Sequence, residues 1–267
     1  MNKIQAVIFD WSGTTIDYGS RAPMGVFVKV FAHFGIDITI AEARGPMGLP
    51  KWHHIRALLE RPRIATAWES AQGTPADDAA ATQIYKHFVP ANIAVAAASA
   101  TLIPGTSATV AALRKRHIRI GSTTGYTRDI MEEILPVAEA QGYKPDTLVC
   151  AGDVPQGRPS PLMMYRCLLD LQAYPAWACV KVDDTTPGIS EGLAAGCWTV
   201  GVSLSGNNMG YSQAELAELS PDAYEKQHAI AVETLIGAGA HYVVDSIDHL
   251  LPVIDAIEER LTQGERP

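Results

Sequence analysis

The chain has 267 residues, of which 47% are hydrophobic and 19% are charged, and its formal net charge is −8. This composition supports a substantial core and excludes a largely disordered chain. An acidic chain provides no broad field for attracting nucleic acid or an anionic membrane, so any anion must be bound locally by a few directed groups.

The N-terminus, MNKIQAVIFD, lacks the long apolar region and the cleavage site of a signal peptide. No apolar run reaches the roughly 20 residues of a membrane span. The four cysteines show no metal-ligand spacing and fit reduced core residues: Cys150, Cys167, Cys179 and Cys197. We therefore expect a cytoplasmic protein with no membrane or nucleic-acid partner.

The first β-like run covers residues 3–10 and ends on Asp10, which Gly13 and two threonines follow. A carboxylate at the end of a buried strand is costly without a partner or a task. An aspartate in this place also occurs as a helix cap or in an Asx turn. The position alone therefore leaves the role of Asp10 open.

Between roughly residues 20 and 99 no convincing strand pattern occurs. Helical patterns cover residues 23–35, 51–60 and 81–100 instead. We expect an all-helical cap, residues 21–99, inserted after the first strand of a core formed by residues 1–20 and 100–267. The two hinges are expected near residues 18–22 and 98–104, where Pro104-Gly105 marks the return to the core.

The second half of the chain alternates strands and helices. Four β-like runs, and a plausible further one at the end, cover residues 117–124, 146–152, 178–184, 198–204 and 241–246. Amphipathic helical patterns cover residues 106–116, 127–142, 160–172 and 187–196. This alternation predicts an α/β fold, a Rossmann-like parallel sheet covered by helices on both faces.

Ligands of open α/β sheets bind beyond the carboxyl ends of the strands. The residues that end or follow the predicted strands are Asp10, Ser122, Thr123, Thr124, Gly125, Arg158, Asp183, Asp184, Thr185 and Thr186. Each has an ordinary explanation by itself, as a turn, a cap or a surface residue. Together, hard oxygens suit a divalent metal, and hydroxyls, backbone amides and a guanidinium suit a phosphoryl-like anion.

These segments resemble the haloacid dehalogenase superfamily. DWSGTTID (10–17) is similar to its first motif, D-x-x-G-T, and VDDTTPG (182–188) to its acidic motif. Thr124 falls at the hydroxyl of the second motif, and Arg158 at the cation of the third, which is usually lysine. The resemblance implies a Rossmann-like core with an inserted cap and Asp10 as the nucleophile. It also implies Mg²⁺ held by Asp10, the Ser12 carbonyl and Asp184.

Two positions depart from this pattern. Ser12 stands where many phosphatases of the superfamily carry a second aspartate that protonates the leaving group. A carbon leaving group with delocalised electrons would tolerate this change, provided that an electron sink is present. Gly188 stands where many members carry a further acidic residue, which favours Asp184 as the metal ligand and leaves the role of Asp183 open.

Lys51 is a candidate for the electron sink, because a neutral lysine forms a Schiff base with an aldehyde. It follows Pro50 at a predicted helix start, near His54 and Arg56. Lowering a lysine pKa from about 10.4 to about 7 takes roughly 4–5 kcal/mol. A helix dipole supplies about 1 kcal/mol, so neighbouring charge or desolvation must supply the rest. By position alone Lys51 also fits a solvated residue at the start of a helix.

GLPKWHHIRAL (48–58), together with DWSGTTIDYG, GSTTGYTR and GRPSP, resembles the phosphonoacetaldehyde hydrolase family. The resemblance implies hydrolysis of the C–P bond of a small phosphonate through an imine on Lys51 and an aspartyl phosphate on Asp10. It further implies substrate-binding or transition-state roles for Thr124, Gly125, Arg158, His54, Met47, Gly48 and Tyr126, with His54 moving protons during the imine chemistry. A homodimer formed through the cap is also implied, with residues 23–34 as a plausible contact or, equally, as cap core.

Three other functions fit the same segments. A phosphate-ester phosphatase would not need Lys51, and a haloacid dehalogenase would use Asp10 on carbon without a metal. A binding protein that kept the fold would form neither covalent intermediate. Borohydride trapping, EDTA treatment and a Lys51→Arg variant distinguish these possibilities.

Overall fold

The structure is a computed structural model that describes residues 3–267. Its centre is a parallel sheet with the strand order β3-β2-β1-β4-β5-β6. The strands are β1 (Ala6–Phe9), β2 (Arg119–Thr124), β3 (Thr147–Cys150), β4 (Cys179–Asp183), β5 (Trp198–Val202) and β6 (Tyr242–Val244). Each of the six β-like runs in the sequence contains one of these strands, which confirms the predicted α/β fold.

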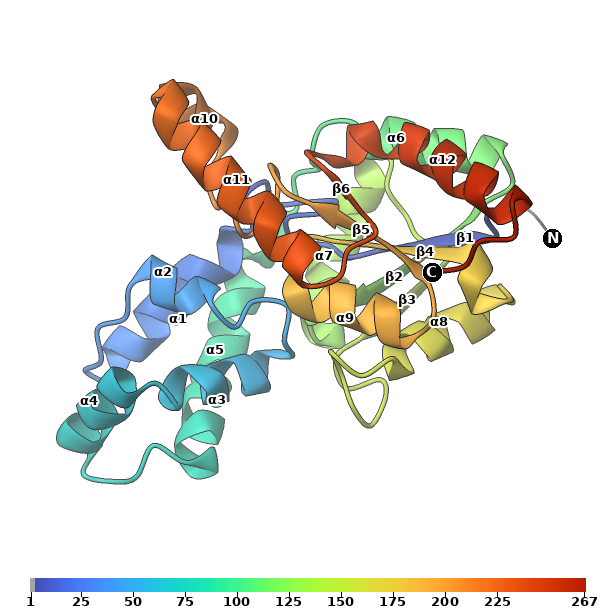
Figure 1. The fold of residues 1–267 in the computed structure, drawn as a ribbon. Coiled ribbons are helices and arrows are strands. Elements are labelled where there is room, and N and C mark those ends of the chain that lie inside the picture. The colour runs from blue at the N-terminus through green and yellow to red at the C-terminus, as the bar shows by residue number, and fades with distance from the viewer. Residues whose placement is uncertain (1–2) are drawn as a thin grey trace.

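Helices cover both faces of the sheet (Figure 1). They are α6 (Thr106–Lys115), α7 (Arg128–Ala140), α8 (Leu162–Leu171), α9 (Thr186–Ala194), α11 (Pro221–Gly237) and α12 (Leu250–Thr262), with short 3-10 turns at Ala176–Ala178 and Ile247–His249. The short helix α10 (Gln213–Glu218) lies at the outer end of α11, away from the sheet (Figure 1). Val7 and Phe9 of β1 pack in the apolar cluster that includes α6, α7 and α12. Ala6 and Ile8 pack in the cluster that includes α8, as the alternation of side chains along a strand requires.

Five helices between β1 and β2 form a separate lobe (Figure 1). They are α1 (Ala22–His33), α2 (Ile40–Arg44), α3 (Lys51–Leu59), α4 (Pro62–Gln72) and α5 (Asp78–Ser99). The lobe has its own apolar cluster, whose buried members lie between Met24 and Phe88. We call this lobe the cap; the exact division into residues 21–99 and the rest stays a prediction.

The two connections between the cap and the core run side by side. The backbone N–H of Asp17 donates to the Thr101 carbonyl at 3.0 Å, and Ile16 forms a bridge with Leu102. Asp17 also accepts hydrogen bonds from the backbone N–H groups of Arg21 and Ala22 and so caps the start of α1. Asp17 therefore links the connection that follows β1 to α1, the first helix of the cap.

The apolar stretch at residues 23–34 is mostly cap core. Met24, Phe27 and Phe31 are at most 1% exposed and pack inside the cap cluster. Of the two interpretations of this stretch, the structure favours the interior one. The homodimer stays a prediction that a single chain does not test.

The helical patterns expected at residues 106–116, 127–142, 160–172 and 187–196 correspond to α6, α7, α8 and α9. The sequence patterns do not predict α2, α4, α10, α11 or α12. For α11 the reason is physical, because only Ala231 and Leu235 of its residues are fully buried, which leaves a weak amphipathic pattern. Within residues 3–267 no helix is long and apolar enough to cross a membrane, and all four cysteines are buried and unpaired.

Candidate active site

A cavity lies at the carboxyl edge of the sheet, where the cap meets the core. Its lining residues are Asp10, Ser12, Met47, Gly48, Lys51, Thr124, Gly125, Tyr126, Arg158 and Thr185. Those from the core follow β1, β2, β3 and β4, and those from the cap come from the turn before α3 and its first residue. The structure thus brings together most of the residues that the sequence singled out, with Asp184 close by and His54 outside the lining.

Asp10, Asp183 and Asp184 form a buried acidic cluster. Carboxylate oxygens of the three lie within 4.8 Å of one another. Burial, and then the charge of Asp183, raises the pKa of Asp10 to about 6 although Arg158 opposes the change. Burial, and then the charges of the other two carboxylates, raises the pKa of Asp184 well above its ordinary value. The cluster therefore holds negative charge that the protein alone does not fully compensate.

Asp184 is held in one orientation from two sides. Its Oδ1 accepts a hydrogen bond from Thr14 Oγ1 at 2.9 Å, and its Oδ2 accepts one from the Asn207 backbone N–H at 2.7 Å. Carboxylate oxygens that are fixed in this way and still electrostatically uncompensated suit a hard divalent cation. The residues of the cluster therefore fit Mg²⁺.

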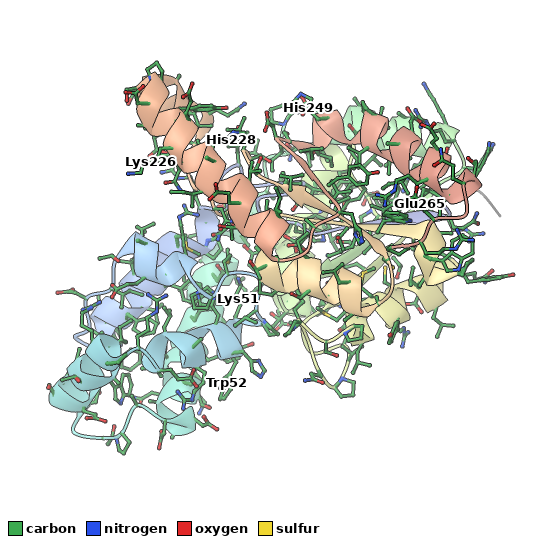
Figure 2. The ribbon with its side chains drawn as sticks, in the orientation of Figure 1. Lys51, Trp52, Lys226, His228, His249 and Glu265 are labelled. Atoms are coloured by element: carbon green, nitrogen blue, oxygen red, sulfur yellow. The ribbon has the colours of Figure 1, made fainter. Side chains whose placement is uncertain are left out.

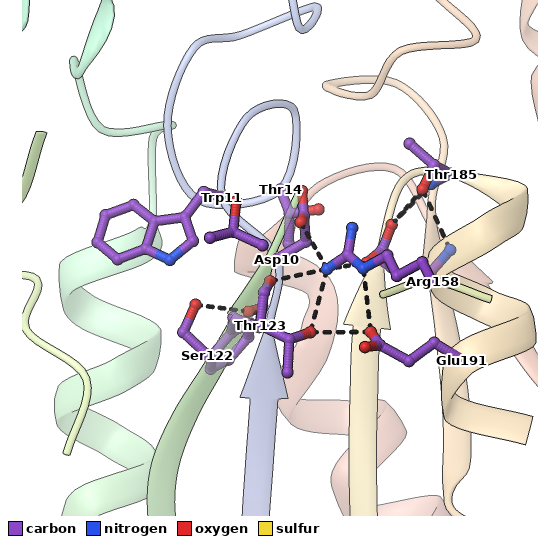
Figure 3. A network of polar contacts seen from close by, with 12 residues as sticks. Asp10, Trp11, Thr14, Ser122, Thr123, Arg158, Thr185 and Glu191 are labelled. Carbon is purple, nitrogen blue, oxygen red and sulfur yellow. Dashed lines mark hydrogen bonds and ion pairs between the residues drawn. The ribbon is translucent and has the colours of Figure 1, made fainter. Parts of the chain in front are cut away.

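Arg158 lies beside Asp10 (Figure 3). It is 4% exposed. Its Nη2 lies 2.8 Å from an oxygen of Asp10, and its Nε lies 3.0 Å from an oxygen of Glu191. Nη2 also donates to the Thr123 carbonyl at 2.7 Å. The guanidinium is thus locked by partners on three elements and presents a fixed positive charge at the cavity floor.

Two residues of this network, Lys181 and Glu191, are not among those that the sequence singled out. Both are fully buried. Lys181 Nζ lies 3.0 Å from Asp183 Oδ2 and 3.4 Å from Glu191 Oε2. A lysine in the middle of an apolar strand, and a glutamate on the buried side of a helix, are the signals that could have found them, because charged residues are buried almost only in pairs.

Ser12 points its side chain away from the acidic cluster. Its Oγ donates to Asp17 Oδ2 at 2.6 Å and lies 3.0 Å from the Ser20 hydroxyl. The hydroxyl therefore links the loop after β1 to the first connection to the cap. Only the side chain of Ser12 takes part in these contacts, so its backbone carbonyl stays free of them.

Lys51 is the first residue of α3, on the cap (Figure 2). It is 5% exposed. Its Nζ lies 3.7 Å from Met47 Sδ and 5.0 Å from the centre of the Tyr126 ring. Within residues 3–267, no carboxylate lies within ion-pair distance of this amine. Burial, opposed by Asp10 and assisted by Arg158, lowers the pKa of Lys51 to about 8. About a tenth of the amine is thus neutral at pH 7, far more than for an ordinary lysine.

His54 does not line the cavity. Its Nε2 lies 2.8 Å from the Ala43 carbonyl, and its ring stacks on Phe27 at 4.0 Å. Burial lowers the pKa of His54 well below its ordinary value, and the charge of Lys51 adds to this effect. His54 is therefore neutral and cannot repel the Lys51 ammonium, and Arg56 instead pairs with Asp78 at 2.8 Å. The lysine pKa is lowered by burial and by Arg158 of the core.

Gly125, the residue that follows β2, allows the backbone of the cap to come close to the end of this strand. A Cβ atom at this position would lie 2.9 Å from the Leu49 carbonyl oxygen of the cap. Thr124, next to it, accepts a hydrogen bond on Oγ1 from the Tyr126 backbone N–H at 3.1 Å. The absence of a side chain at residue 125 thus brings the backbone of the cap directly over this turn.

Residues 4–196 match the family model of a haloacid dehalogenase-like hydrolase. The phosphonoacetaldehyde hydrolases of Paraburkholderia xenovorans and Paraburkholderia phytofirmans are 53% and 52% identical to the chain, over 100% of both sequences in each case. The crystal structure of a phosphonoacetaldehyde hydrolase like protein from Oleispira antarctica superposes with a TM-score of 0.97 at 43% identity, covering 99% of this chain and 96% of the other.

The chain therefore belongs to the haloacid dehalogenase-like hydrolases and, within that class, to the phosphonoacetaldehyde hydrolase family.

Proposed function

We propose that the enzyme hydrolyses the C–P bond of phosphonoacetaldehyde to acetaldehyde and phosphate. The observation that carries the proposal is a buried amine without a carboxylate partner in the described chain, Lys51, in the same small cavity as Asp10 and Arg158. The names of the full-length relatives agree with this substrate. Hydrolysis of a phosphate ester would give such an amine no task.

In the first stage Lys51 supplies a neutral amine. Nζ attacks the aldehyde carbon of the substrate, and loss of water leaves a protonated imine. The apolar contacts of Lys51 with Met47 and Tyr126 favour the uncharged nucleophile. They also keep bulk water from the imine while the cap is closed over the core. His54 remains a candidate for proton transfer in this stage only through an intervening group, because its ring lies outside the cavity lining.

In the second stage an oxygen of Asp10 attacks phosphorus and the P–C bond breaks. The electron pair of that bond moves toward the protonated imine, so that the departing carbon forms an enamine and Asp10 carries the phosphoryl group. Arg158 and the turn of Thr124 and Gly125 lie where they would bind the phosphoryl oxygens. Protonation of the enamine and attack by water then release acetaldehyde from Lys51, and a second water releases phosphate from Asp10.

Mg²⁺ would be held by Asp10, the Ser12 carbonyl and Asp184, and it would neutralise negative charge on the phosphoryl group. The hydrogen bonds from Thr14 and Asn207 fix Asp184 for this purpose. Asp10 with a pKa raised to about 6 gains from such a cation, because a nearby positive charge favours the carboxylate over the acid.

The side chain of Ser12 also supports a carbon leaving group. Its hydroxyl is engaged with Asp17 and Ser20 and is a poor acid. No strong acid therefore occupies the position from which many relatives protonate an ester oxygen. An enamine leaves without being protonated at that moment, since its charge is neutralised by the iminium nitrogen.

Borohydride trapping tests the proposal. The enzyme is incubated with phosphonoacetaldehyde, reduced, digested and mapped by mass spectrometry. We expect an N-ethyl group on Lys51 and on no other lysine, because reduction captures the imine of the product acetaldehyde. The Lys51→Arg variant is the control and should give no adduct. Phosphate release from phosphate esters by this variant at the wild-type rate, without any adduct in the wild type, would instead favour an ester phosphatase.

A homodimer and a cytoplasmic location complete the proposal. The resemblance to the family supports the first, and the reduced, buried cysteines agree with the second. Sedimentation equilibrium at micromolar concentration tests the dimer directly, and a monomer at all concentrations would contradict it.

A further inference from the structure

Asp183 at the end of β4 is fully buried and does not line the cavity. Its Oδ1 accepts hydrogen bonds from the Thr185 backbone N–H at 3.0 Å and from the Thr185 hydroxyl at 2.7 Å. Its Oδ2 lies 3.0 Å from Lys181 Nζ and 3.3 Å from Arg158 Nη2. The carboxylate is therefore fixed by the backbone on one side and faces two buried cations on the other.

The space beside Gly188 is filled by this carboxylate. A Cβ atom at residue 188 would lie 2.0 Å from both Cγ and Oδ2 of Asp183 and 2.2 Å from its Oδ1. Contacts this short do not occur, so any side chain at residue 188 would displace the Asp183 side chain. The volume beside residue 188 is thus taken up by an acidic group that comes from the end of β4.

The buried charges around Arg158 indicate what the Asp183 carboxylate does. Arg158 and Lys181 face Asp10, Asp183 and Glu191 through ion pairs of 2.8–3.4 Å. Without Asp183, the remaining carboxylate partner of Lys181 among the described residues would be Glu191. Arg158 would still pair with Asp10 and Glu191. Because the pairs are buried, removing this anion leaves two cations to share the two remaining carboxylates, and their positions shift.

We propose that Asp183 is a positioning residue: its carboxylate occupies the volume left free by Gly188 and there holds Arg158, and through Arg158 the Asp10 carboxylate, in place. The inference rests on the proposed function only for the roles of Asp10 and Arg158. The pairing of residues 183 and 188 follows from packing alone.

A double-mutant cycle tests the packing without substrate. Gly188→Ala should lower the Tm of the wild type by about 5 °C, because it forces the carboxylate from its site. In an Asp183→Gly background the same change should leave the Tm unchanged or raise it, since alanine favours the helix α9 over glycine. A parallel cycle on Asp183→Ala covers the case in which the glycine variant does not fold. An equal loss in both backgrounds would overturn the proposed overlap.

The positioning role is tested with Asp183→Asn, which keeps the shape and removes the charge. We expect kcat for phosphonoacetaldehyde to fall about 100-fold, with KM changed less than about threefold because residue 183 does not reach the cavity. The Mg²⁺ concentration that gives half of the maximal Tm increase should rise, because the acidic cluster loses one charge. The double variant Asp183→Gly/Gly188→Asp should recover at least tenfold in kcat/KM over Asp183→Gly alone.

A folded Asp183→Asn variant with wild-type kcat would overturn the positioning role, as would equal activity of Asp183→Gly and the double variant. The thermal cycle needs no substrate, so it stands even if the enzyme does not act on phosphonoacetaldehyde. Failure of the proposed function would instead appear as the absence of a Lys51 adduct in the wild type.

Discussion

Lys51→Met should abolish the proposed activity and at the same time stabilise the fold at neutral pH. The amine is buried without a carboxylate partner in the described chain, and its pKa is lowered from 10.5 to about 8. A lowered lysine pKa means that the protonated form is less stable in the folded than in the unfolded protein. Below pH 8 this group therefore opposes folding, and the opposition fades as the pH rises toward 10.5.

The size of the effect follows from the shift. A difference of about 2.5 pKa units corresponds to about 3 kcal/mol at pH 7, and the same two pKa values give about 2 kcal/mol at pH 9 and less than about 1 kcal/mol at pH 10. Methionine has a similar length and no charge, so it should recover most of this energy. We expect the free energy of unfolding of Lys51→Met to exceed that of the wild type by about 2–3 kcal/mol at pH 7.

The measurement is urea unfolding of both proteins at pH 7 and pH 9, followed by circular dichroism. Lys86→Met on α5 is the matched control, because its lysine is exposed on the same set of helices. The control should change the free energy of unfolding by less than about 0.5 kcal/mol. A Lys51→Met variant that is less stable than the wild type, or a gain that does not shrink at pH 9, would refute the assignment of Lys51 as a destabilised buried amine.

Three further predictions concern the reaction. The kcat/KM for phosphonoacetaldehyde should rise about tenfold per pH unit below pH 8 and level off above it, since the pKa of Lys51 is about 8 and only the neutral amine attacks; a flat profile from pH 6 to pH 9 would contradict this. EDTA should remove activity and Mg²⁺ should restore it, as phosphate release measures; full activity in excess EDTA would exclude the proposed metal role. Asp10→Asn should lower phosphate release more than about 1000-fold and still allow an imine to be trapped on Lys51, whereas wild-type phosphate release would remove Asp10 from the mechanism.

The sequence predicted the sheet and the place of the site because both depend on local patterns. Apolar runs that end on polar residues located Asp10 and Asp184, and parallel strands bring their carboxyl ends to one edge. The role of Lys51 could not be predicted from local sequence alone, because a lysine at the start of a helix is usually exposed unless other residues cover it. The covering atoms come from Met47, Tyr126 and Phe27, which lie in two different lobes.

The interactions that the sequence did not reveal are those between distant charges. Lys181 and Glu191 each look like an isolated charge in an apolar segment, and only the packing of α9 on β4 makes them partners. The sequence likewise suggested His54 and Arg56, basic residues close to Lys51 along the chain, as the groups that lower the lysine pKa. In the folded protein burial and Arg158, which lies 107 positions further along the chain, do so.

The reactive groups of the proposed mechanism are divided between the two lobes: Asp10 and Arg158 lie in connections that follow strands of the core, whereas Lys51 belongs to an inserted block of helices. Such a division makes the carbonyl chemistry an exchangeable module. A chimera that keeps the core but takes its cap from an ester-cleaving relative should lose imine formation. Its core should still carry the groups that bind and transfer the phosphoryl group. Replacing one contiguous piece of chain would therefore change the substrates that the enzyme accepts.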